Sequence, residues 1–391
     1  MDFAILLSKA SSHKPIRRIT AHACFLLLVS LAAPVHAQQP AAWKDTSPHV
    51  TQFVTVDNGV QLEVLNWGGT GRPLVLLSGL GNTAHVFDDF APRLTSQAHV
   101  YGITRRGFGS SSAPDSGYSA DRLGDDVLAV MSALKIEKPV LVGHSLAGEE
   151  LSSVGTRHPD KVAGLVYLEA VWPYTYYTSR GDTLIDVIDM QKQLSLWLTP
   201  IKLPDREKLA QGMLEEIAQL ERDLKGWQSA IENDSKNPAS PPSREATDVD
   251  KATFAAFQTW TARTQGVTFP EAELRQSYEV RPDGGVGERR MHVTAAKAIT
   301  LGAEKYTGLT VPVLVICAIP HNLGYTYYND EAARSTAEAL DAAQDEPIVK
   351  AFGASVPSAR VVRLARASHY VFLSNEEDVL REIFAFLRGL Q

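Results

Sequence analysis

Residues 140–150 read VLVGHSLAGEE. An apolar run ends in a glycine, and His144 and Ser145 then lead directly into the small residues Ala147 and Gly148. This order is typical of a buried strand that turns sharply into a helix. A serine on such a turn projects its hydroxyl from the carboxyl edge of a sheet, and the close packing of strand and helix requires small neighbours. We therefore predict that Ser145 is a nucleophile; the alternative is a serine that only caps the helix.

Short apolar runs and helical patterns alternate along most of the chain. Residues 51–57 and 60–66 alternate apolar and polar side chains around Asn58-Gly59, which predicts a hairpin. The other apolar runs are unbroken, as a parallel sheet covered on both faces requires. These expected strands are 73–78, 98–103, 139–142, 162–168, 311–318 and 359–364, and the expected helices are 119–134, 146–157, 332–343 and 376–388. The alternation predicts an α/β fold with a mostly parallel central sheet and helices on both faces.

The alternation stops between residues 171 and 308. Within this segment, residues 203–230 carry apolar side chains at steps of three and four, which predicts a long amphipathic helix. A polar, proline-bearing linker follows at 235–248, and then more helical sequence. We expect a helical insertion folded over the sheet; the alternative is a separate interaction domain.

The N-terminal sequence is typical of a secretory signal. Four basic residues precede an apolar run at 23–33, and Val35-His36-Ala37 ends in a small-residue site, so cleavage is expected after Ala37. The run is shorter than the ~20 residues that span a bilayer, although an uncleaved anchor is the alternative. The sequence thus predicts a secreted or periplasmic protein with residues 1–37 as its signal peptide.

Charge and cysteine content narrow the classes of partner. Removal of residues 1–37 would leave 34 Lys and Arg against 44 Asp and Glu, and Cys317 as a single cysteine. The acidic balance argues against nucleic acid or an anionic membrane surface as partner. A single cysteine excludes an intramolecular disulfide, so we expect the hydrophobic core to stabilise the fold. We expect the partner to be a small molecule.

Four motifs in order resemble those of the α/β-hydrolase family. They are LLSGLGN at 76–82, RRGFGSSS at 105–112, GHSLAG at 143–148 and ASHYVFLS at 367–374. The resemblance implies a hydrolase core in two parts, 38–170 and 309–391, with a helical cap at 171–308. It also implies a Ser-His-acid triad in which the acid and then the histidine follow the nucleophile in the chain.

His369 fits the last place of that order, because it follows the strand 359–364 and a short loop at 365–368. A histidine there can reach a nucleophile at the same edge of the sheet, whereas the alternative is a surface histidine. His144 is adjacent to Ser145 but is expected to point elsewhere, and His321, His158 and His85 are weaker candidates.

The acid departs from the common pattern of the family, which places it after the strand that follows the cap. Here that loop carries His321 and Asn322, with no Asp or Glu before Asp330. Glu169 follows the strand 162–168, and the surrounding segment RHPDKVAGLVYLEA resembles one group of haloalkane dehalogenases that carry their acid there. We predict Glu169 as the triad acid. The alternatives are a structural ion pair, or a dyad in which Asn322 or water orients His369.

The resemblance also implies an oxyanion hole made by the main-chain N–H groups of Leu80 and Leu146. An ordinary glycine loop is the alternative at 79–81, and we expect Arg106 to be architectural, tied to neighbouring main chain. Aromatic side chains at the start of the cap are expected either to line a substrate pocket or to pack cap against core. They are Trp172, Tyr174, Tyr176 and Tyr177, with Tyr327 and Tyr328 as further candidates for the same wall.

Together these features predict a serine hydrolase that cleaves a carboxylic ester through an acyl-enzyme. No cofactor or metal is required, since no cysteine–histidine cluster with ligand spacing and no phosphate loop is evident. Amidase, aminopeptidase, lactonase and carbon–carbon hydrolase activities use the same arrangement and stay open. A non-catalytic binding protein on a hydrolase scaffold is the alternative from another class.

Overall fold

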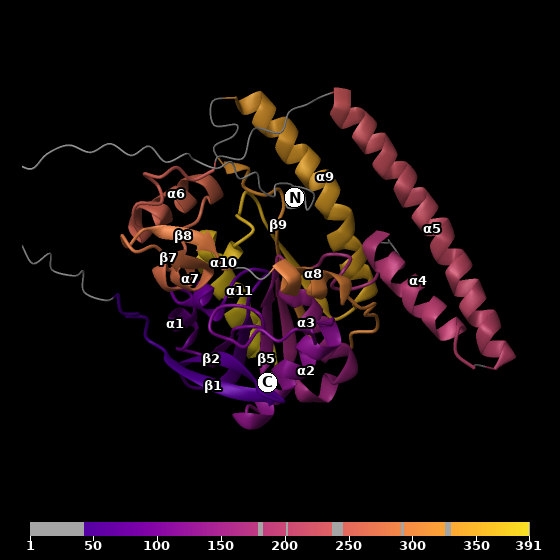
Figure 1. The fold of residues 1–391 in the computed structure, drawn as a ribbon, viewed down its shortest axis with the longest axis horizontal. Helices are drawn as coiled ribbons and strands as arrows, with labels where there is room; N and C mark the ends of the chain where they lie inside the picture. Colours follow the sequence, from indigo (N-terminus) through magenta and orange to yellow (C-terminus); the bar gives the residue numbers. More distant parts are fainter. Residues whose placement is uncertain are drawn as a thin grey trace, which may run out of the picture. The chain divides into compact units, whose positions relative to one another are not determined.

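One sheet of eight strands, in the order β1-β2-β4-β3-β5-β6-β9-β10, forms the centre of the fold (Figure 1). The computed structural model describes residues 43–178, 183–200, 202–236, 245–290, 293–324 and 330–390. The strands are β1 (Val50–Asp57), β2 (Val60–Gly68), β3 (Arg72–Leu77), β4 (Ala98–Ile103), β5 (Val140–His144), β6 (Gly164–Leu168), β9 (Val313–Ala318) and β10 (Ala359–Leu364). All eight predicted strands are therefore present within a few residues of their expected bounds.

The sheet is mostly parallel, as predicted. β1 and β2 form the antiparallel hairpin, in which Asp57 pairs with Val60 and Gly59 takes a φ of +73°. That left-handed value favours glycine and explains the Asn-Gly pair. β2 also pairs antiparallel with β4, and every later pairing in the sheet is parallel.

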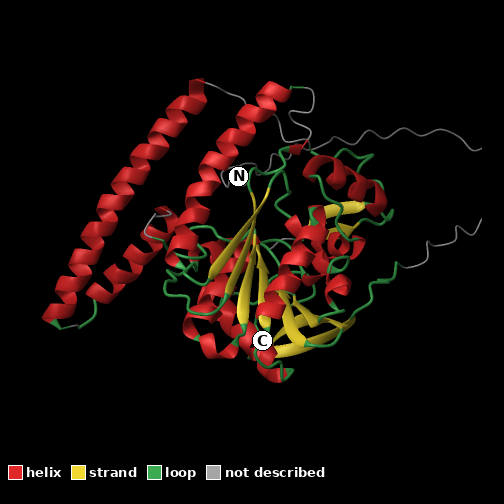
Figure 2. Cartoon of the chain, turned by 180° about the vertical axis from the view of Figure 1, so that it is seen from behind, coloured by secondary structure: helices red, strands yellow, loops and turns green. Residues whose placement is uncertain are grey.

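Helices cover both faces of the sheet (Figure 2). The helices of the core are α1 (Ala91–Leu94), α2 (Ala120–Ala133), α3 (Gly148–Arg157), α9 (Glu331–Ser355), α10 (Val371–Ser374) and α11 (Glu376–Gly389), with 3₁₀ turns η2 (Ala84–Phe87), η3 (Ser145–Ala147) and η4 (Pro159–Lys161). α9 continues 12 residues beyond the predicted end at 343 and passes through Pro347. Buried Val349 and Phe352 lie after the proline, so their packing offsets the hydrogen bond that it removes.

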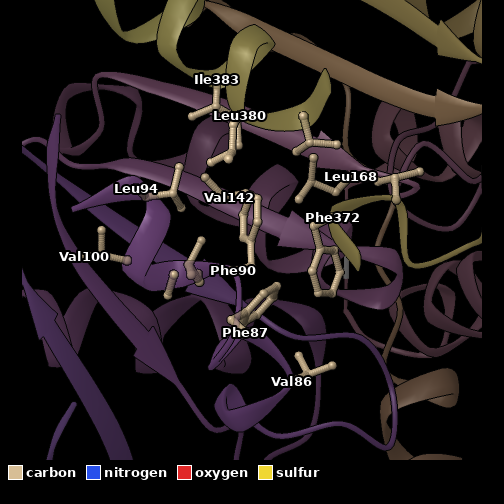
Figure 3. Close-up of a cluster of buried hydrophobic side chains, with 14 of the residues drawn as sticks. Val86, Phe87, Phe90, Leu94, Val100, Val142, Leu168, Phe372, Leu380 and Ile383 are labelled. Carbon is tan, nitrogen blue, oxygen red and sulfur yellow. The ribbon is translucent and has the colours of Figure 1, made fainter. Parts of the chain in front are cut away.

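Two apolar clusters fill the two sides of the sheet. In one, Phe87, Phe90 and Phe372 meet, with ring centroids of the Phe87–Phe372 pair 4.8 Å apart (Figure 3). Leu380 and Ile383 of α11 close this cluster from outside. Burying such side chains provides most of the favourable free energy of folding, roughly 2–3 kcal/mol for each large one.

The segment between β6 and β9 contains five helices and a short hairpin among its described residues. They are α4 (Thr183–Trp197), α5 (Leu203–Lys236), α6 (Phe254–Gln265), α7 (Glu271–Ser277), α8 (Val293–Leu301), β7 (Tyr278–Val280) and β8 (Val286–Arg289). α4 packs along α5, and α7 packs against α6 (Figure 1). α7 also packs against η2. The β7–β8 hairpin was not predicted; Asp283-Gly284 is the turn signal that marks it.

The chain divides into two compact units, Met1–Lys44 and Asp45–Gln391. Everything described below lies in the second unit, and the predicted signal peptide lies outside the described residues. None of the helices in the described ranges is long and apolar enough to cross a membrane.

Candidate active site

Ser145 lies on a strained turn between β5 and α3. Its φ is +53°, a left-handed value that is uncommon for a residue with a side chain. A Cβ at Gly143 would lie 2.9 Å from the Leu151 side chain, and a Cβ at Gly148 would lie 2.4 Å from the Ala170 carbonyl oxygen. The small residues around Ser145 thus let strand and helix approach closely. This is the reason given above for the small residues on both sides of the serine.

Strand register places Ser145 beside Glu169. β5 and β6 are parallel, and His144 pairs directly with Leu168. Ser145 and Glu169 are the next residues of the two strands, so both leave the same edge of the sheet at the same level. Glu169 also takes a positive φ, of +51°.

The Glu169 carboxylate is buried and holds three hydrogen bonds. Oε1 accepts from the main-chain N–H of Ala318 at 2.5 Å, and Oε2 accepts from His321 Nε2 at 2.6 Å and from His369 Nδ1 at 3.4 Å. Burial opposes ionisation, but the hydrogen bonds from His321 and His369 outweigh it and lower the pKa of Glu169 to about 2. Glu169 is therefore an anion that faces the Nδ1 side of His369.

His369 lies in the loop after β10, against the residue that precedes Ser145. Its carbonyl oxygen accepts a hydrogen bond from His144 Nε2 at 3.0 Å, and the two imidazole centroids are 4.7 Å apart. Burial holds the pKa of His144 well below its usual value, so this ring stays neutral beside His369. Among the described residues, no hydrogen bond joins the Ser145 hydroxyl to His369; in substrate-free active sites such contacts are often long.

His321 is the site residue that sequence reasoning undervalued. Its Nε2 faces Glu169, while its Nδ1 lies 3.1 Å from Asp341 Oδ2 and 3.3 Å from Asp345 Oδ2. Burial acts against the charge, but the hydrogen bonds to Asp345 and Glu169 raise the pKa of His321 to about 11. Both ring nitrogens therefore donate to carboxylates, and a cation occupies the loop where the family usually keeps its acid.

Asn322, the other candidate in that loop, has a local role. Its side-chain oxygen accepts from the main-chain N–H of Gly324 at 2.9 Å, and the residue is exposed. Among the described contacts, none joins the Asn322 side chain to His369. The only carboxylate that the described structure brings to His369 Nδ1 is Glu169.

The turn after β3 passes directly over Ser145. A Cβ at Gly79 would lie 3.1 Å from Ser145 Cβ and 2.9 Å from His144 Nδ1, so no larger residue fits. The side chains of Leu80 and Leu146 pack in the same apolar cluster. Among the described residues, Leu80 donates its main-chain N–H to no main-chain oxygen, which leaves this N–H group available for a substrate oxygen.

A buried arginine holds the turn after β3 through its main-chain carbonyl groups. Arg105 forms a bidentate pair with Glu150 of α3, with both N···O distances 2.7 Å, and donates to the carbonyl oxygens of Ser78 and Gly79. The prediction that Arg106 is tied to main chain is wrong, because Arg106 pairs with the Asp126 carboxylate at 2.6 and 2.7 Å. The neighbouring Arg105 makes the main-chain contacts instead.

The helical insertion reaches the same turn through Glu273 of α7. This buried carboxylate accepts from Asn82 Nδ2 at 2.9 Å, from Thr83 Oγ1 at 2.5 Å and from the Thr83 main-chain N–H. The Asn82 side-chain oxygen in turn accepts from the Tyr370 hydroxyl at 3.1 Å. Glu273 thus connects the insertion to both the turn at 79–83 and the residue after His369, a link that no local sequence signal shows.

The four aromatic residues at the start of the insertion have different surroundings. Tyr174 packs beside Leu80 and Leu146, where Ile299 of α8 completes the cluster. Trp172 donates its indole N–H to the carbonyl oxygen of Glu169 at 3.2 Å.

The other two of these aromatics contact α9 and Lys305. Tyr176 is buried against Phe352 of α9 and belongs to the core. Tyr177 lies under Lys305, whose Nζ is 4.6 Å from the ring centroid. Tyr327 and Tyr328 lie outside the described residues.

Comparison with known proteins extends these observations to a family. A family described as the alpha/beta hydrolase fold matches residues 72–376. The chain is 29% identical over 147 residues to the 2-hydroxymuconate semialdehyde hydrolase of Pseudomonas sp. CF600, covering 33% of this chain and 52% of that protein. It is 32% identical over 150 residues to the bifunctional esterase/perhydrolase of Acinetobacter calcoaceticus, covering 36% of this chain and 54% of that protein.

The chain thus spans about half the length of these curated relatives. Among solved structures, that of E-2-(acetamidomethylene)succinate hydrolase superposes with a TM-score of 0.53 at 19% identity. The superposition covers 87% of this chain and 99% of the other. At this level of identity the likeness concerns the fold alone.

Proposed function

Because this chain belongs to the α/β-hydrolase family, we propose that it is a serine hydrolase that cleaves a carboxylic ester through Ser145, His369 and Glu169. The observation that carries this proposal is the register of β5 and β6, which brings the strained Ser145 and the buried anion Glu169 to one sheet edge. His369 contacts the anion through Nδ1 and lies against the turn that holds Ser145.

The proposed reaction begins with proton transfer. Glu169 accepts the Nδ1 hydrogen of His369, so Nε2 is the basic nitrogen and takes the Ser145 proton as Oγ attacks the ester carbonyl carbon. The developing oxyanion accepts hydrogen bonds from the main-chain N–H groups of Leu80 and Leu146. When the tetrahedral intermediate collapses, the alcohol leaves with the proton that His369 returns, and an acyl-Ser145 ester remains.

Hydrolysis of the acyl-enzyme repeats these steps with water. His369 Nε2 accepts a proton as the water oxygen attacks the acyl carbon, and the same proton returns to Ser145 Oγ when the acid leaves. His321 has a supporting part in this proposal: shared between Glu169, Asp341 and Asp345, it fixes the Glu169 carboxylate at Oε2 without leaving an unpaired buried charge.

An ester is favoured over other acyl substrates because the name of the A. calcoaceticus relative includes an esterase activity. Cleavage of a carbon–carbon bond is the second candidate, favoured by the name of the Pseudomonas relative. Leu146, the residue after Ser145, packs in one apolar cluster with Tyr174 and Ile299, which suits a small apolar acyl or aryl group.

Parallel assays with p-nitrophenyl acetate, an aminoacyl-arylamide and a vinylogous 1,5-diketone test this assignment. We expect turnover of the ester with a kcat/KM at least tenfold above that of the other two. Turnover of only the arylamide would overturn the ester assignment in favour of an amidase, and turnover of only the diketone would favour the carbon–carbon hydrolase.

A secreted or periplasmic location is part of the proposal and is supported by the N-terminal pattern alone. N-terminal sequencing of the protein exported by a bacterial host tests it. We expect a mature chain that begins at Gln38, and a chain retained in the cytosol with its N-terminal segment intact would contradict this.

A further inference from the structure

A second cluster of ligating side chains lies outside the active site. It joins Asp45 and His49, which precede β1, to His85 and Asp88 around η2. One nitrogen from each imidazole and one oxygen from each carboxylate lie within 4.8 Å of one another. Sequence spacing did not reveal the set, because its two halves are about 40 residues apart in the chain.

From this geometry we propose that Asp45, His49, His85 and Asp88 bind one zinc ion that has a structural role. Zinc bonds of about 2.1 Å in a tetrahedron separate neighbouring ligand atoms by about 3.4 Å. Asp88 Oδ1 lies 2.9 Å from His49 Nδ1 and Asp88 Oδ2 lies 2.8 Å from His85 Nδ1, while Asp45 Oδ2 lies 3.5 Å from His85 Nδ1 and 3.6 Å from His49 Nε2. Both oxygens of Asp88 and both nitrogens of His49 take part in these contacts, so an ion would use one atom of each, and a set of four such ligand atoms lies within 4.8 Å of one another.

The charges around the cluster suit a divalent cation. The Asp88 side chain is 1% exposed, and that of Glu63, which faces His85, is 3% exposed. Within the described part of the chain, neither lysine nor arginine pairs with Asp45, Glu63 or Asp88. A zinc ion would neutralise the two carboxylates that it binds, as buried anions require.

A buried carboxylate faces the second ring nitrogen of His85. Its Nδ1 faces the cluster, whereas its Nε2 faces Glu63 Oε1 at 3.6 Å and is buried without a hydrogen bond. Glu63 is itself held by the Thr104 hydroxyl at 2.8 Å. A carboxylate behind a ligating imidazole fixes the tautomer and strengthens the metal bond.

The donor set selects among metals. Two imidazoles and two carboxylates suit zinc, whereas calcium and magnesium prefer sites built from oxygen alone. Four protein ligands complete a tetrahedron, which is typical of a structural zinc site rather than a catalytic one. The ion would connect Asp45 and His49, before β1, to His85 and Asp88, in and after η2. η2 itself begins immediately after the turn at 79–83.

The experiment uses the full chain, stripped with a chelator and titrated with zinc chloride in a calorimeter. We expect one zinc per chain and a rise of a few degrees in Tm on addition of zinc, with no rise on addition of calcium or magnesium. Absence of saturable zinc binding by the stripped wild-type protein would overturn the proposal.

Variants assign the binding to this cluster. We expect His49→Gln and Asp45→Asn each to weaken zinc binding at least about 100-fold, since loss even of a supporting contact costs 10–100-fold. His99→Gln is the matched control, because His99 bonds to Asn66 and stacks on Tyr101 outside the cluster.

One further variant addresses the active site. His321→Gln removes a member of the second group of ligating side chains, formed with Glu169 and His369. Zinc binding that persists in His49→Gln but disappears in His321→Gln would place the ion in the active site and overturn the proposal. If His49→Gln does not fold by circular dichroism, Asp45→Asn decides, since the Asp45 side chain is 27% exposed.

Discussion

Replacing Glu169 by glutamine should reduce turnover by removing the acceptor that orients His369. The glutamine side-chain oxygen can still accept from the Ala318 N–H, as Oε1 does now at 2.5 Å. The amide nitrogen then takes the place of Oε2 and can only donate, although His321 Nε2 lies 2.6 Å and His369 Nδ1 lies 3.4 Å away, so both histidines lose their acceptor. His369 must then leave Nδ1 unprotonated, so that its hydrogen moves to Nε2, the nitrogen that should accept the Ser145 proton.

We expect kcat for p-nitrophenyl acetate to fall by about 10³–10⁴, which corresponds to about 4–5.5 kcal/mol of activation free energy. KM should change little, because Glu169 is buried and faces His369 rather than substrate. Stability should fall as well: a pKa of about 2 instead of 4.5 represents about 3 kcal/mol of stabilisation of the ionised carboxyl at neutral pH.

The control for this loss is Glu338→Gln. Glu338 is another largely buried carboxylate and forms a bidentate pair with Arg366 at 2.8 and 3.0 Å, and none of its described contacts involves His369. We expect it to lower Tm without changing kcat. A loss of kcat under about threefold in a folded Glu169→Gln protein would refute the triad and favour a Ser-His dyad oriented by water.

Three further predictions concern the surroundings of the site. Gly79→Ala should abolish activity, because its Cβ would lie 2.9 Å from His144 Nδ1, whereas Gly226→Ala in α5, which has open space around it, should leave kcat unchanged. Glu273→Gln should lower kcat about tenfold at constant KM. This loss is smaller than the roughly 10²–10³-fold loss of kcat when an oxyanion-hole donor is removed. An unchanged kcat would show that the turn at 79–83 does not need its hydrogen bonds to Glu273. His321→Gln should cost most stability near pH 6 and about 2–3 kcal/mol less near pH 8.5, measured by urea unfolding. The sign follows from a folded pKa of about 11 above the ordinary 6.5, since the stabilisation is complete below pH 6.5 and is lost as the pH rises toward 11; a pH-independent difference would contradict it.

The sheet was predictable because its strands carry their own signal. Unbroken apolar runs and an Asn-Gly turn depend on local sequence, and the structure confirms each strand within a few residues. Ser145 stands out for the same reason, since its glycine and alanine neighbours are required by local packing.

The contacts between distant segments could not be predicted in this way. The prediction of Glu169 relied on the adjacency of two strands, which the register confirms, but the part of His321 depends on α9, whose Asp341 and Asp345 follow it by about 20 residues. Glu273 reaches the turn at 79–83 across more than 180 residues. A single sequence carries no signal for such pairs, because the residues next to a buried carboxylate in the chain do not indicate which distant segment it contacts.

The most direct test of the proposed chemistry is labelling of the purified protein with a fluorophosphonate, followed by peptide mass mapping. We predict one phosphonyl adduct, on Ser145, and at least about a 10³-fold slower reaction in His369→Ala, because the hydroxyl is a weak nucleophile without its base. Folded wild-type protein that does not react at Ser145 would contradict the account and favour a binding protein on a hydrolase scaffold.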